Sequence, residues 1–586
     1  MPDKMQLVVA APCVPRQASS IYASSFFALQ PSSRSLRRRR PMRREPPAMR
    51  AGMPRLLPTD GPRYGLRDLF TPLETLLTSG GDQRIAIDPA SRVNEYGCAA
   101  QPEPEIWNFA SSTASSISER AYQRAALARE ELVHKSLFNE VDVTFDARNE
   151  AMREELRAHL QLSPGVGVVF SASGTDAQLH ALFAAGVVLG APPVTVVVGS
   201  DQTGSGTLYT ARERHFSSVT ASGSAVRKDA PVAGLGCESI ALPLLGDTGD
   251  IAPRADADAA VLRAVEASLA QGRRVLLHIM DSSKLGWRAP SEACLGEIAN
   301  RWPGKAQVVV DACQMRLGRK RLRSHLDRGH MVLITGSKFF GGPAFSGALL
   351  VPEGLSRPPG RAADIAPGFF DYASRSDWPM GWTALRSRFG SRPNFGHWLR
   401  WEAALEEIGS YYAVPDAFRT KALGEFEAGV ASMIALTPSL GAIRSGTGSI
   451  GVDDEEFVHA TIFPFTLKRR GGQASIADYR AIHRALARDM RDEVKGSAAD
   501  RRVAAQPCLV GQPVRLKRPD DGMLACVLRL CLGARLLTEA WSADSAQAQR
   551  NLQRILDRVA HVLVKIELLL DPADEMAQAR ASTSGV

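Results

Sequence analysis

The chain lacks paired cysteines and long apolar segments, and these absences exclude several classes of protein. Its eight cysteines in 586 residues include no pair spaced Cys-x2-Cys, which excludes that zinc-binding spacing and is typical of free thiols in a reducing compartment. No apolar run is long enough to span a bilayer, and the longest, such as residues 194–198, predict buried strands. We therefore expect a cytoplasmic protein with no membrane partner and no metal site.

A basic excess is also missing from most of the chain, although the formal net charge is +9. Residues 1–55 contain 11 Lys/Arg and 2 Asp/Glu, which leaves 60 residues of each sign in the remainder. A neutral body disfavours a nucleic-acid groove, because such a groove needs clustered basic side chains. Residues 1–60 are rich in Arg, Ser and Pro, which predicts a disordered basic tail. We interpret this tail as an extension ahead of a later start, with an organelle transit peptide as the alternative.

Strands, glycine turns and helices alternate from about residue 150, and this order predicts the fold class. At 586 residues the chain is too long for one core, so two or more domains are expected. Apolar, β-branched runs between helical stretches predict an α/β domain with a mostly parallel sheet covered on both faces. The predicted strands are residues 167–170, 194–198, 275–279, 307–310, 331–334 and 348–351. Residues 450–586 mix strands with a long terminal helix and predict a smaller α+β domain.

Two polar residues follow strands that should lie in the parallel sheet. Asp311 ends the strand at residues 307–310, and Lys338 lies 27 residues later in a Gly/Ser-rich loop, residues 335–343. Ligands of such sheets bind beyond the carboxyl ends of the strands. A carboxylate there can keep a pyridine nitrogen protonated, and a lysine can form an imine with an aldehyde, so the pair indicates pyridoxal 5′-phosphate (PLP) as cofactor. The alternatives are an Asp that caps a turn and a lysine that is exposed on its loop.

A third motif stands at the start of a predicted helix. Ser173, Gly174, Thr175 and Asp176 follow the strand at residues 167–170. Small residues at a helix start leave backbone N–H groups free, and the helix dipole favours a dianion there. The motif therefore fits a phosphate site, and the alternative is a plain N-cap formed by Ser173 or Thr175.

In this order, the motifs resemble those of the fold-type I PLP-dependent enzymes, the aspartate aminotransferase superfamily. The resemblance covers residues 168–350 and is strongest to the branch of class-V aminotransferases, cysteine desulfurases and kynureninase. It implies that Lys338 carries the cofactor as a Schiff base and later moves a proton at the substrate α-carbon, and that Asp311 pairs with the pyridine nitrogen. It also implies the remaining cofactor-binding residues: Ser173, Gly174, Thr175, Asp176, Thr203, Ser282, Gln314, Thr335 and Ser337.

The resemblance also gives several residues their expected roles. Gln314 resembles the donor to the cofactor's phenolic oxygen, and Thr335 and Ser337 resemble further phosphate ligands. Arg529 resembles the arginine that grips the substrate α-carboxylate, a task that suits a planar fork of donors. Arg535 is the other candidate for this role. The alternative interpretation of Arg529 is a surface salt bridge.

A hydroxyl-rich run precedes the large domain, at residues 108–116. N-terminal segments of this fold often cover the active site, so the resemblance implies that Ser112 and Thr113 in this run contact the substrate. The alternative is a polar linker.

The sequence departs from the family pattern at three places. Class-V members usually carry a His before the lysine, where this chain has Ser337. The stretch expected to supply a ring that stacks on the cofactor, residues 202–206, contains none, so Thr203 or His215 is expected in that role. Residues 281–283 replace the usual Asn-bearing loop near the phenolic oxygen. These departures leave PLP binding as the expectation and the reaction type open.

Three functions are weighed on this basis. The first is an aminotransferase that acts on an amino acid or related amine. The second is a PLP-dependent lyase, of the β-elimination, desulfurase-like or decarboxylase-like kind; the absence of cysteine between Lys338 and Cys508 disfavours persulfide chemistry. The third is a non-catalytic PLP-fold binding protein.

The resemblance also implies how the chain is organised and assembled. We expect an N-terminal segment that covers the active site at residues 61–150 and a PLP-binding large domain at residues 151–395. A small α+β C-terminal domain follows at residues 396–586. Because this fold places its active site between two subunits, a homodimer is expected.

Overall fold

The computed structural model describes most of the chain after residue 64. The described residues are 65–246, 251–356, 364–443, 454–469, 472–516 and 525–583. The chain divides into two units, Met1–Gly61 and Pro62–Val586, and the architecture below is that of the second unit. The expected disordered tail, residues 1–60, lies outside the described residues, so its disorder stays a prediction.

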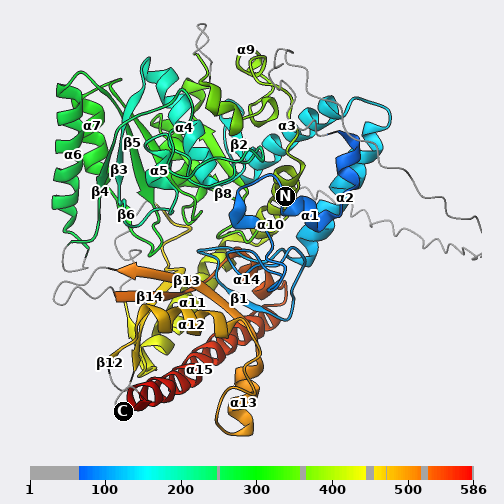
Figure 1. The fold of residues 1–586 in the computed structure, drawn as a ribbon, viewed down its shortest axis with the longest axis vertical. Helices are drawn as coiled ribbons and strands as arrows, with labels where there is room; N and C mark the ends of the chain where they lie inside the picture. The colour runs from blue at the N-terminus through cyan, green and yellow to red at the C-terminus, as the bar shows by residue number, and fades with distance from the viewer. Residues whose placement is uncertain are drawn as a thin grey trace, which may run out of the picture. The chain divides into compact units, whose positions relative to one another are not determined.

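The larger of two sheets is mostly parallel. Its strands follow in the order β2-β9-β8-β7-β5-β3-β4, and β6 pairs with β5 beside this path. Figure 1 labels β2, β3, β4, β5, β6 and β8 of this sheet. The pairs from β8 through β7, β5 and β3 to β4 are parallel, whereas β9 is antiparallel to both of its neighbours and β6 is antiparallel to β5. The strands are β2 (Gly167–Ser171), β3 (Pro193–Val198), β4 (Ser239–Leu242), β5 (Arg274–Asp281), β6 (Arg288–Ala289), β7 (Ala306–Asp311), β8 (Met331–Thr335) and β9 (Gly347–Val351). This topology confirms the predicted α/β class.

Both faces of this sheet are buried, which explains the continuous apolar runs in its strands. Along β8, Val332 and Ile334 join one hydrophobic cluster, and Met331 and Leu333 join the other. This alternation follows from the period of two in a strand. The first cluster includes residues of α6, α7 and α8, and the second includes residues of α4. These helices are α4 (Gly174–Leu189), α6 (Arg254–Ala270), α7 (Glu292–Arg301) and α8 (Arg319–Asp327).

A buried helix, α10 (Phe395–Ala413), joins the N-terminal segment to the large sheet. It packs against α2 (Glu119–Ser136) and α3 (Val141–Leu160). On α10, Glu402 is fully buried, and its carboxylate accepts hydrogen bonds from Arg148 Nε at 2.5 Å and from Trp398 Nε1 at 3.1 Å. Since a buried carboxylate is costly without partners, these contacts fix the position of α10.

Short helices connect the larger elements. They are η1 (Leu66–Phe70), α1 (Leu73–Leu77), η2 (Gln83–Ile85), α5 (Thr207–Thr210), η3 (Glu353–Leu355), η4 (Pro367–Asp371), η5 (Arg375–Asp377) and α9 (Thr383–Arg386). Among the described residues, no helix is both long enough and apolar enough to cross a membrane.

The second sheet belongs mainly to the C-terminal part of the chain and has the order β1-β13-β14-β11-β10, with β12 paired to β11. β1 is parallel to β13, and the other pairs are antiparallel. Its strands are β1 (Trp107–Phe109), β10 (Leu440–Ala442), β11 (Ile462–Arg469), β12 (Gly472–Gln473), β13 (Cys508–Leu516) and β14 (Ala525–Cys531). The helices of this region are α11 (Asp416–Leu436), α12 (Ile476–Leu486), α13 (Ala498–Ala505), α14 (Ala534–Ala540) and α15 (Ser545–Thr583). The predicted α+β character of this region is confirmed.

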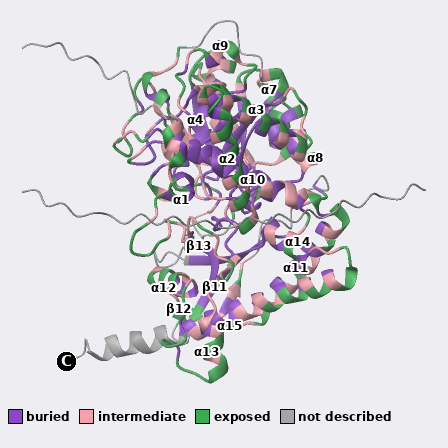
Figure 2. Ribbon diagram, turned by 90° about the vertical axis from the view of Figure 1, so that its right-hand side faces the viewer, coloured by how far each residue is buried: buried purple, intermediate pink, exposed green. Residues whose placement is uncertain are grey.

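One face of α15 packs into the main hydrophobic core, as its apolar period predicts. Leu552, Ile555, Val559 and Ile566 are each at most 1% exposed. In Figure 2 buried and exposed residues mix along this helix. The helix therefore has an inner face that contributes to stability and an outer face that does not.

Ile566 and Val564 allow a matched test of this packing, because Ile566 is fully buried and Val564 is 41% exposed. Ile566→Ala should lower the free energy of unfolding by about 2–5 kcal/mol, because it leaves a cavity in the core. Val564→Ala should change it by about 1 kcal/mol or less. Urea-induced unfolding followed by circular dichroism measures both, and equal losses would contradict the assignment of the inner face.

Candidate functional site

A cavity of about 520 Å³ opens where the parallel strands of the large sheet end. Its wall is built from the segments that follow β2, β3, β5, β7 and β8, together with residues of the N-terminal segment and of the second sheet. Asp176 and the two alternative candidates His215 and Arg535 do not line it. The other predicted site residues do: Ser112, Thr113, Ser173, Gly174, Thr175, Thr203, Ser282, Asp311, Gln314, Thr335, Ser337, Lys338 and Arg529. The fold thus brings together residues that are far apart in the sequence, as strand ends of a parallel sheet should.

Asp311 stands at the end of β7, with its carboxylate facing the cavity. Its Oδ1 accepts the N–H of Cys313 at 3.1 Å, and its Oδ2 lies 4.0 Å from Nε2 of His278 on the neighbouring strand β5. His278 is buried, and burial lowers its pKa, so its ring is neutral near pH 7. The carboxylate therefore keeps oxygen lone pairs free to accept a hydrogen bond from a ligand in the cavity.

Lys338 lies in the tight connection between β8 and β9, and its side chain lines the same cavity. The Gly341 N–H donates to the Lys338 carbonyl at 3.0 Å, and the Gly342 N–H donates to the Gly336 carbonyl at 3.0 Å. A Cβ on Gly342 would lie 2.8 Å from the Cβ of Ala404 in α10, so only glycine lets this loop pack against that helix. The interpretation of Lys338 as a solvated loop residue does not fit this environment.

The first turn of α4 forms the end of the cavity where a phosphate was expected. Ser173 is the N-cap, and its Oγ accepts the N–H groups of Thr175 at 3.1 Å and Asp176 at 3.2 Å. A Cβ on Gly174 would lie 2.8 Å from Cys313 Sγ, so glycine allows the turn to pack against the segment after Asp311. Ser173 is therefore the N-cap of α4, and it also lines the cavity.

Asp176 is the predicted cofactor-binding residue that the structure places elsewhere. Its carboxylate accepts the hydroxyl hydrogen of Ser173, and it is 2% exposed beneath the first turn of α4. Burial raises its pKa to about 7. Asp is common both in helix caps and in ligand sites, so the sequence alone did not separate these roles.

Two further residues predicted to bind the cofactor, Thr335 and Gln314, already form hydrogen bonds within the protein. The Thr335 hydroxyl donates to the Cys313 carbonyl at 2.7 Å. Gln314 Nε2 donates to the Ser112 carbonyl at 3.1 Å, and its Oε1 accepts from Arg316 Nη1 at 2.8 Å. A primary amide has two N–H bonds, so Gln314 keeps one for a ligand, whereas Thr335 can offer only its oxygen.

Arg529, on β14, is 3% exposed and contacts oxygen atoms of neutral groups. Nη2 donates to the Gln512 carbonyl at 2.8 Å and to Thr113 Oγ1 at 3.3 Å, and Nη1 donates to the Lys284 carbonyl at 3.2 Å. Its competitor Arg535 lines a different cavity, of about 290 Å³. Of these two candidates, Arg529 is therefore the one in this cavity, whose wall also contains Arg84 and Arg515.

Sequence reasoning missed several residues of the wall. Tyr96 and Phe345 supply aromatic rings, whose centroids lie 6.5 Å apart. His215, proposed as a ring that reaches in, instead has its Nδ1 2.6 Å from the hydroxyl of Tyr372 and is not part of the wall. Lys284 is a second lysine in the cavity. Because Lys284 follows a predicted strand, the sequence could have indicated that it lines the cavity. Tyr96 lies in an irregular segment, where the sequence gave no such indication.

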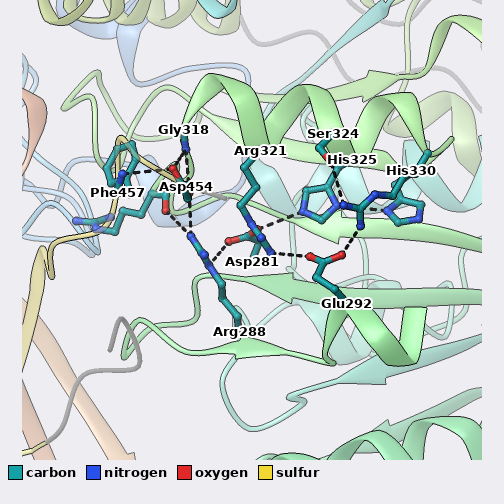
Figure 3. Close-up of polar contacts among 12 residues, drawn as sticks. Asp281, Arg288, Glu292, Gly318, Arg321, Ser324, His325, His330, Asp454 and Phe457 are labelled. Carbon is teal, nitrogen blue, oxygen red and sulfur yellow. Dashed lines mark hydrogen bonds and ion pairs between the residues drawn. The ribbon is translucent and has the colours of Figure 1, made fainter. Parts of the chain in front are cut away.

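A buried ion cluster holds the loop after β5 in place (Figure 3). Asp281, the last residue of β5, lies 2.7 Å from Arg288 Nε, 2.6 Å from Arg321 Nε and 3.3 Å from His325 Nε2. Arg288 also reaches Asp454, at 3.2 Å. Burial acts to raise the pKa of Asp281, but the adjacent Arg288, His325 and Arg321 outweigh it and lower the pKa. The cluster thus fixes the start of the loop that carries Ser282 and Lys284.

Asp281→Asn should lower the free energy of unfolding by about 3–5 kcal/mol, because it leaves two largely buried guanidinium groups without their shared carboxylate. Urea unfolding at neutral pH measures the loss. Asp557→Asn on the exposed side of α15 is the matched control and should change stability by less than about 0.5 kcal/mol. A loss for Asp281→Asn that is no larger than for the control would contradict a structural role for the cluster.

Comparisons with known proteins give remote likenesses. No protein-family model and no curated protein matches the chain. A solved NifS-like protein is 12% identical, with 77% of this chain and 99% of that one covered and a TM-score of 0.45. An Oryza sativa TDC solved with PLP and tryptamine is 14% identical, with 78% and 83% covered and a TM-score of 0.41, and the cysteine desulfurase CsdA of Escherichia coli is 14% identical, with 78% and 94% covered and a TM-score of 0.42. Likenesses of this size carry no argument about the function of this chain.

Proposed function

We propose that this chain is a PLP-dependent enzyme that acts on an amino acid or a related amine, with amino-group transfer as its reaction. The observation that carries the proposal is the shared cavity of Lys338 and Asp311, which follow two neighbouring parallel strands, β8 and β7. A lysine and a carboxylate in one cavity, next to a helix N-terminus, are the groups that this cofactor requires.

The chemistry of the wall fits PLP at each end of the cofactor. At the first turn of α4, Gly174 offers a backbone N–H and Thr175 and Ser337 offer hydroxyl groups, which suits a phosphate dianion. The Ser173 hydroxyl itself donates to Asp176. Asp311 offers a carboxylate to the pyridine nitrogen. When bound, PLP supplies an electron sink for the electron pair left by a broken bond at the substrate α-carbon.

The residues of the chain would divide the work of the reaction among themselves. Asp311 holds a proton on the pyridine nitrogen by charge and hydrogen bonding. Lys338 would hold the cofactor through its amine, and the same amine would move a proton to and from the substrate α-carbon. Arg529 orients the substrate by its α-carboxylate, with Ser112 and Thr113 beside it.

Transfer and elimination differ in their balance of atoms. In transfer, the amino acid is oxidised to a 2-oxo acid, and a second 2-oxo acid is reduced to an amino acid, so both must be present.

A desulfurase-like lyase would need a reactive thiol. The described cysteines are buried or partly buried, and Cys313, which lines the cavity, is 7% exposed with its pKa raised by burial. Buried thiols of raised pKa are poor nucleophiles, which favours transfer over persulfide chemistry.

A homodimer belongs to the same proposal. Four large apolar side chains are at least 60% exposed on α2, α3 and their connection: Leu127, Leu137, Phe138 and Val143. Exposed apolar side chains of this size support a protein interface.

The cofactor assignment can be tested by reduction with borohydride. Purified protein with PLP should absorb visible light, and borohydride should fix the cofactor on Lys338, which peptide mass spectrometry locates. Lys338→Ala should abolish the adduct. Lys284→Ala is the matched control, since Lys284 lies in the same cavity and its replacement should leave the adduct on Lys338.

The outcomes of this experiment separate the alternatives clearly. A protein that takes up no PLP would contradict the proposal and leave a binding protein of unknown ligand. An adduct that persists in Lys338→Ala would move the covalent role to another lysine. With the adduct established, turnover that requires an added 2-oxo acid indicates transfer, whereas turnover without one indicates a lyase.

The role of Asp311 can be tested separately from cofactor binding. Asp311→Asn should still bind PLP through the donors at α4, but turnover should fall by about 100-fold or more, because an amide does not stabilise positive charge on the pyridine nitrogen. Steady-state kinetics and cofactor content measure the two effects. Unchanged turnover in a PLP-loaded variant would remove Asp311 from the mechanism.

A further inference from the structure

The cavity wall contains a second lysine, Lys284, which the proposed chemistry does not use. It lies three residues after Asp281, on the loop that the buried ion cluster holds. Within this loop Ser283 is tightly fixed: its N–H donates to the Trp287 carbonyl at 2.8 Å, and its Oγ accepts the N–H of Leu285 at 3.1 Å. Ser282, which lines the cavity, has a φ of 74°. The position of Lys284 is therefore set by the fold.

Neither Lys284 nor Arg529 has a carboxylate partner within the part of the chain that the structure describes. Arg529 contacts carbonyl and hydroxyl oxygens, and its Nε makes no hydrogen bond there. Burial, with Arg529 and Lys338 nearby, lowers the pKa of Lys284 to about 8. Another cation of the wall, Arg84, differs, since it is paired with Asp82 at 2.6 Å. Lys284 and Arg529 thus line the cavity without an ion-pair partner among the described residues, and the exposed Arg515 adds a further positive charge to the wall.

The acidic groups of the wall compensate Lys284 only in part: Asp201 and Asp311 act to raise its pKa, but burial and the neighbouring cations outweigh them. Asp201 accepts the backbone N–H groups of Leu244 at 2.9 Å and Leu245 at 3.0 Å, which engages both of its oxygens. Asp311 faces the expected pyridine nitrogen. Since a buried charge is costly without a counter-ion, the two cations predict anionic groups on a ligand.

The location of these cations points to the substrate and not to the cofactor phosphate. The Arg529 guanidinium donates to the Lys284 carbonyl, so the two residues are neighbours at the β14 side of the cavity. The expected phosphate end is formed by the first turn of α4, where Gly174 packs against Cys313 and Thr335. The cavity therefore has two anion-binding ends, built from different elements.

We propose that Lys284 and Arg529 together select a substrate with two anionic groups, in which Arg529 receives the α-carboxylate and Lys284 receives an acidic group on the side chain. The substrate class is then an acidic amino acid. This inference rests on the function proposed above and names its specificity. An ammonium group is a point charge with three rotatable donors, so Lys284 accommodates a carboxylate, a sulfonate or a phosphate.

Binding of substrate-like acids without an amino group tests the inference apart from turnover. Calorimetric titration of the PLP-loaded protein with succinate and with butyrate compares two acids of equal chain length that differ in one carboxylate. Succinate should bind at least about tenfold more tightly, as expected for one charge-assisted contact. In Lys284→Gln, the affinities for succinate and butyrate should differ by no more than about twofold. Lys284→Arg should still prefer succinate. Lys305→Gln, an exposed lysine far from the wall, is the matched control and should behave as the wild type.

The outcomes distinguish this inference from the proposed function. Equal affinity for succinate and butyrate in the wild type, or a preference that survives Lys284→Gln, would overturn it. So would a Lys284→Gln variant that loses PLP affinity but keeps its preference, because Lys284 would then serve the cofactor phosphate. If the borohydride adduct forms on Lys338 while any of these results is found, the inference fails and the PLP assignment stands.

The kind of acidic group can be read from amino acids in the same protein. Aspartate, cysteate and O-phosphoserine should each change the visible spectrum at concentrations at least about tenfold below that needed for alanine. Lys284→Gln should remove this advantage. The ranking of the three acids identifies the side-chain group that the Lys284 end accepts, and an advantage for alanine over all three would overturn the proposal.

Discussion

The parallel pairing of β7 with β8 is the constraint on which the rest of the site depends. In a parallel pair both strands end at the same edge of the sheet. Asp311 is in register with Leu333, so Lys338 lies five residues beyond the carboxylate's level, in the loop that leaves this edge. If β7 and β8 were antiparallel, Asp311 and Lys338 would lie at opposite edges of the sheet and could not contact the same ligand. The close approach of the loop to Ala404 on α10 then keeps the lysine at that edge.

The second half of the cavity comes from segments that are not part of the large sheet. β1 pairs with β13, and this pairing sets the hydroxyl-rich run after β1 beside Arg529 on β14. The Gln314 amide connects the same run to the segment after Asp311. The cavity wall is thus shared by the two sheets, and the N-terminal segment connects them.

The fold and much of the cavity were predictable because the signals were local. The strands of the large sheet are β-branched runs buried on both faces, and the residues that follow them are polar. Helices α2 and α3 were not predicted, since much of their buried surface is Ala or polar, as at Ala121, Ala125 and Asp146, and the apolar period is weak. The placement of Asp176 and the presence of Tyr96 in the wall depend on packing between distant segments, which a single sequence does not show.

The pairing of β1 with β13 also affects how the chain folds during translation. Trp107 is matched with Cys508, 401 residues later in the chain. At the usual pace of translation the early strand waits roughly 20–80 s for its partner to leave the ribosome. During that time the large sheet can already assemble, while an apolar strand remains without a neighbour. The β14 side of the cavity is therefore among the last parts of the fold to form. Until then, the nascent chain can associate there with other chains unless a chaperone binds it.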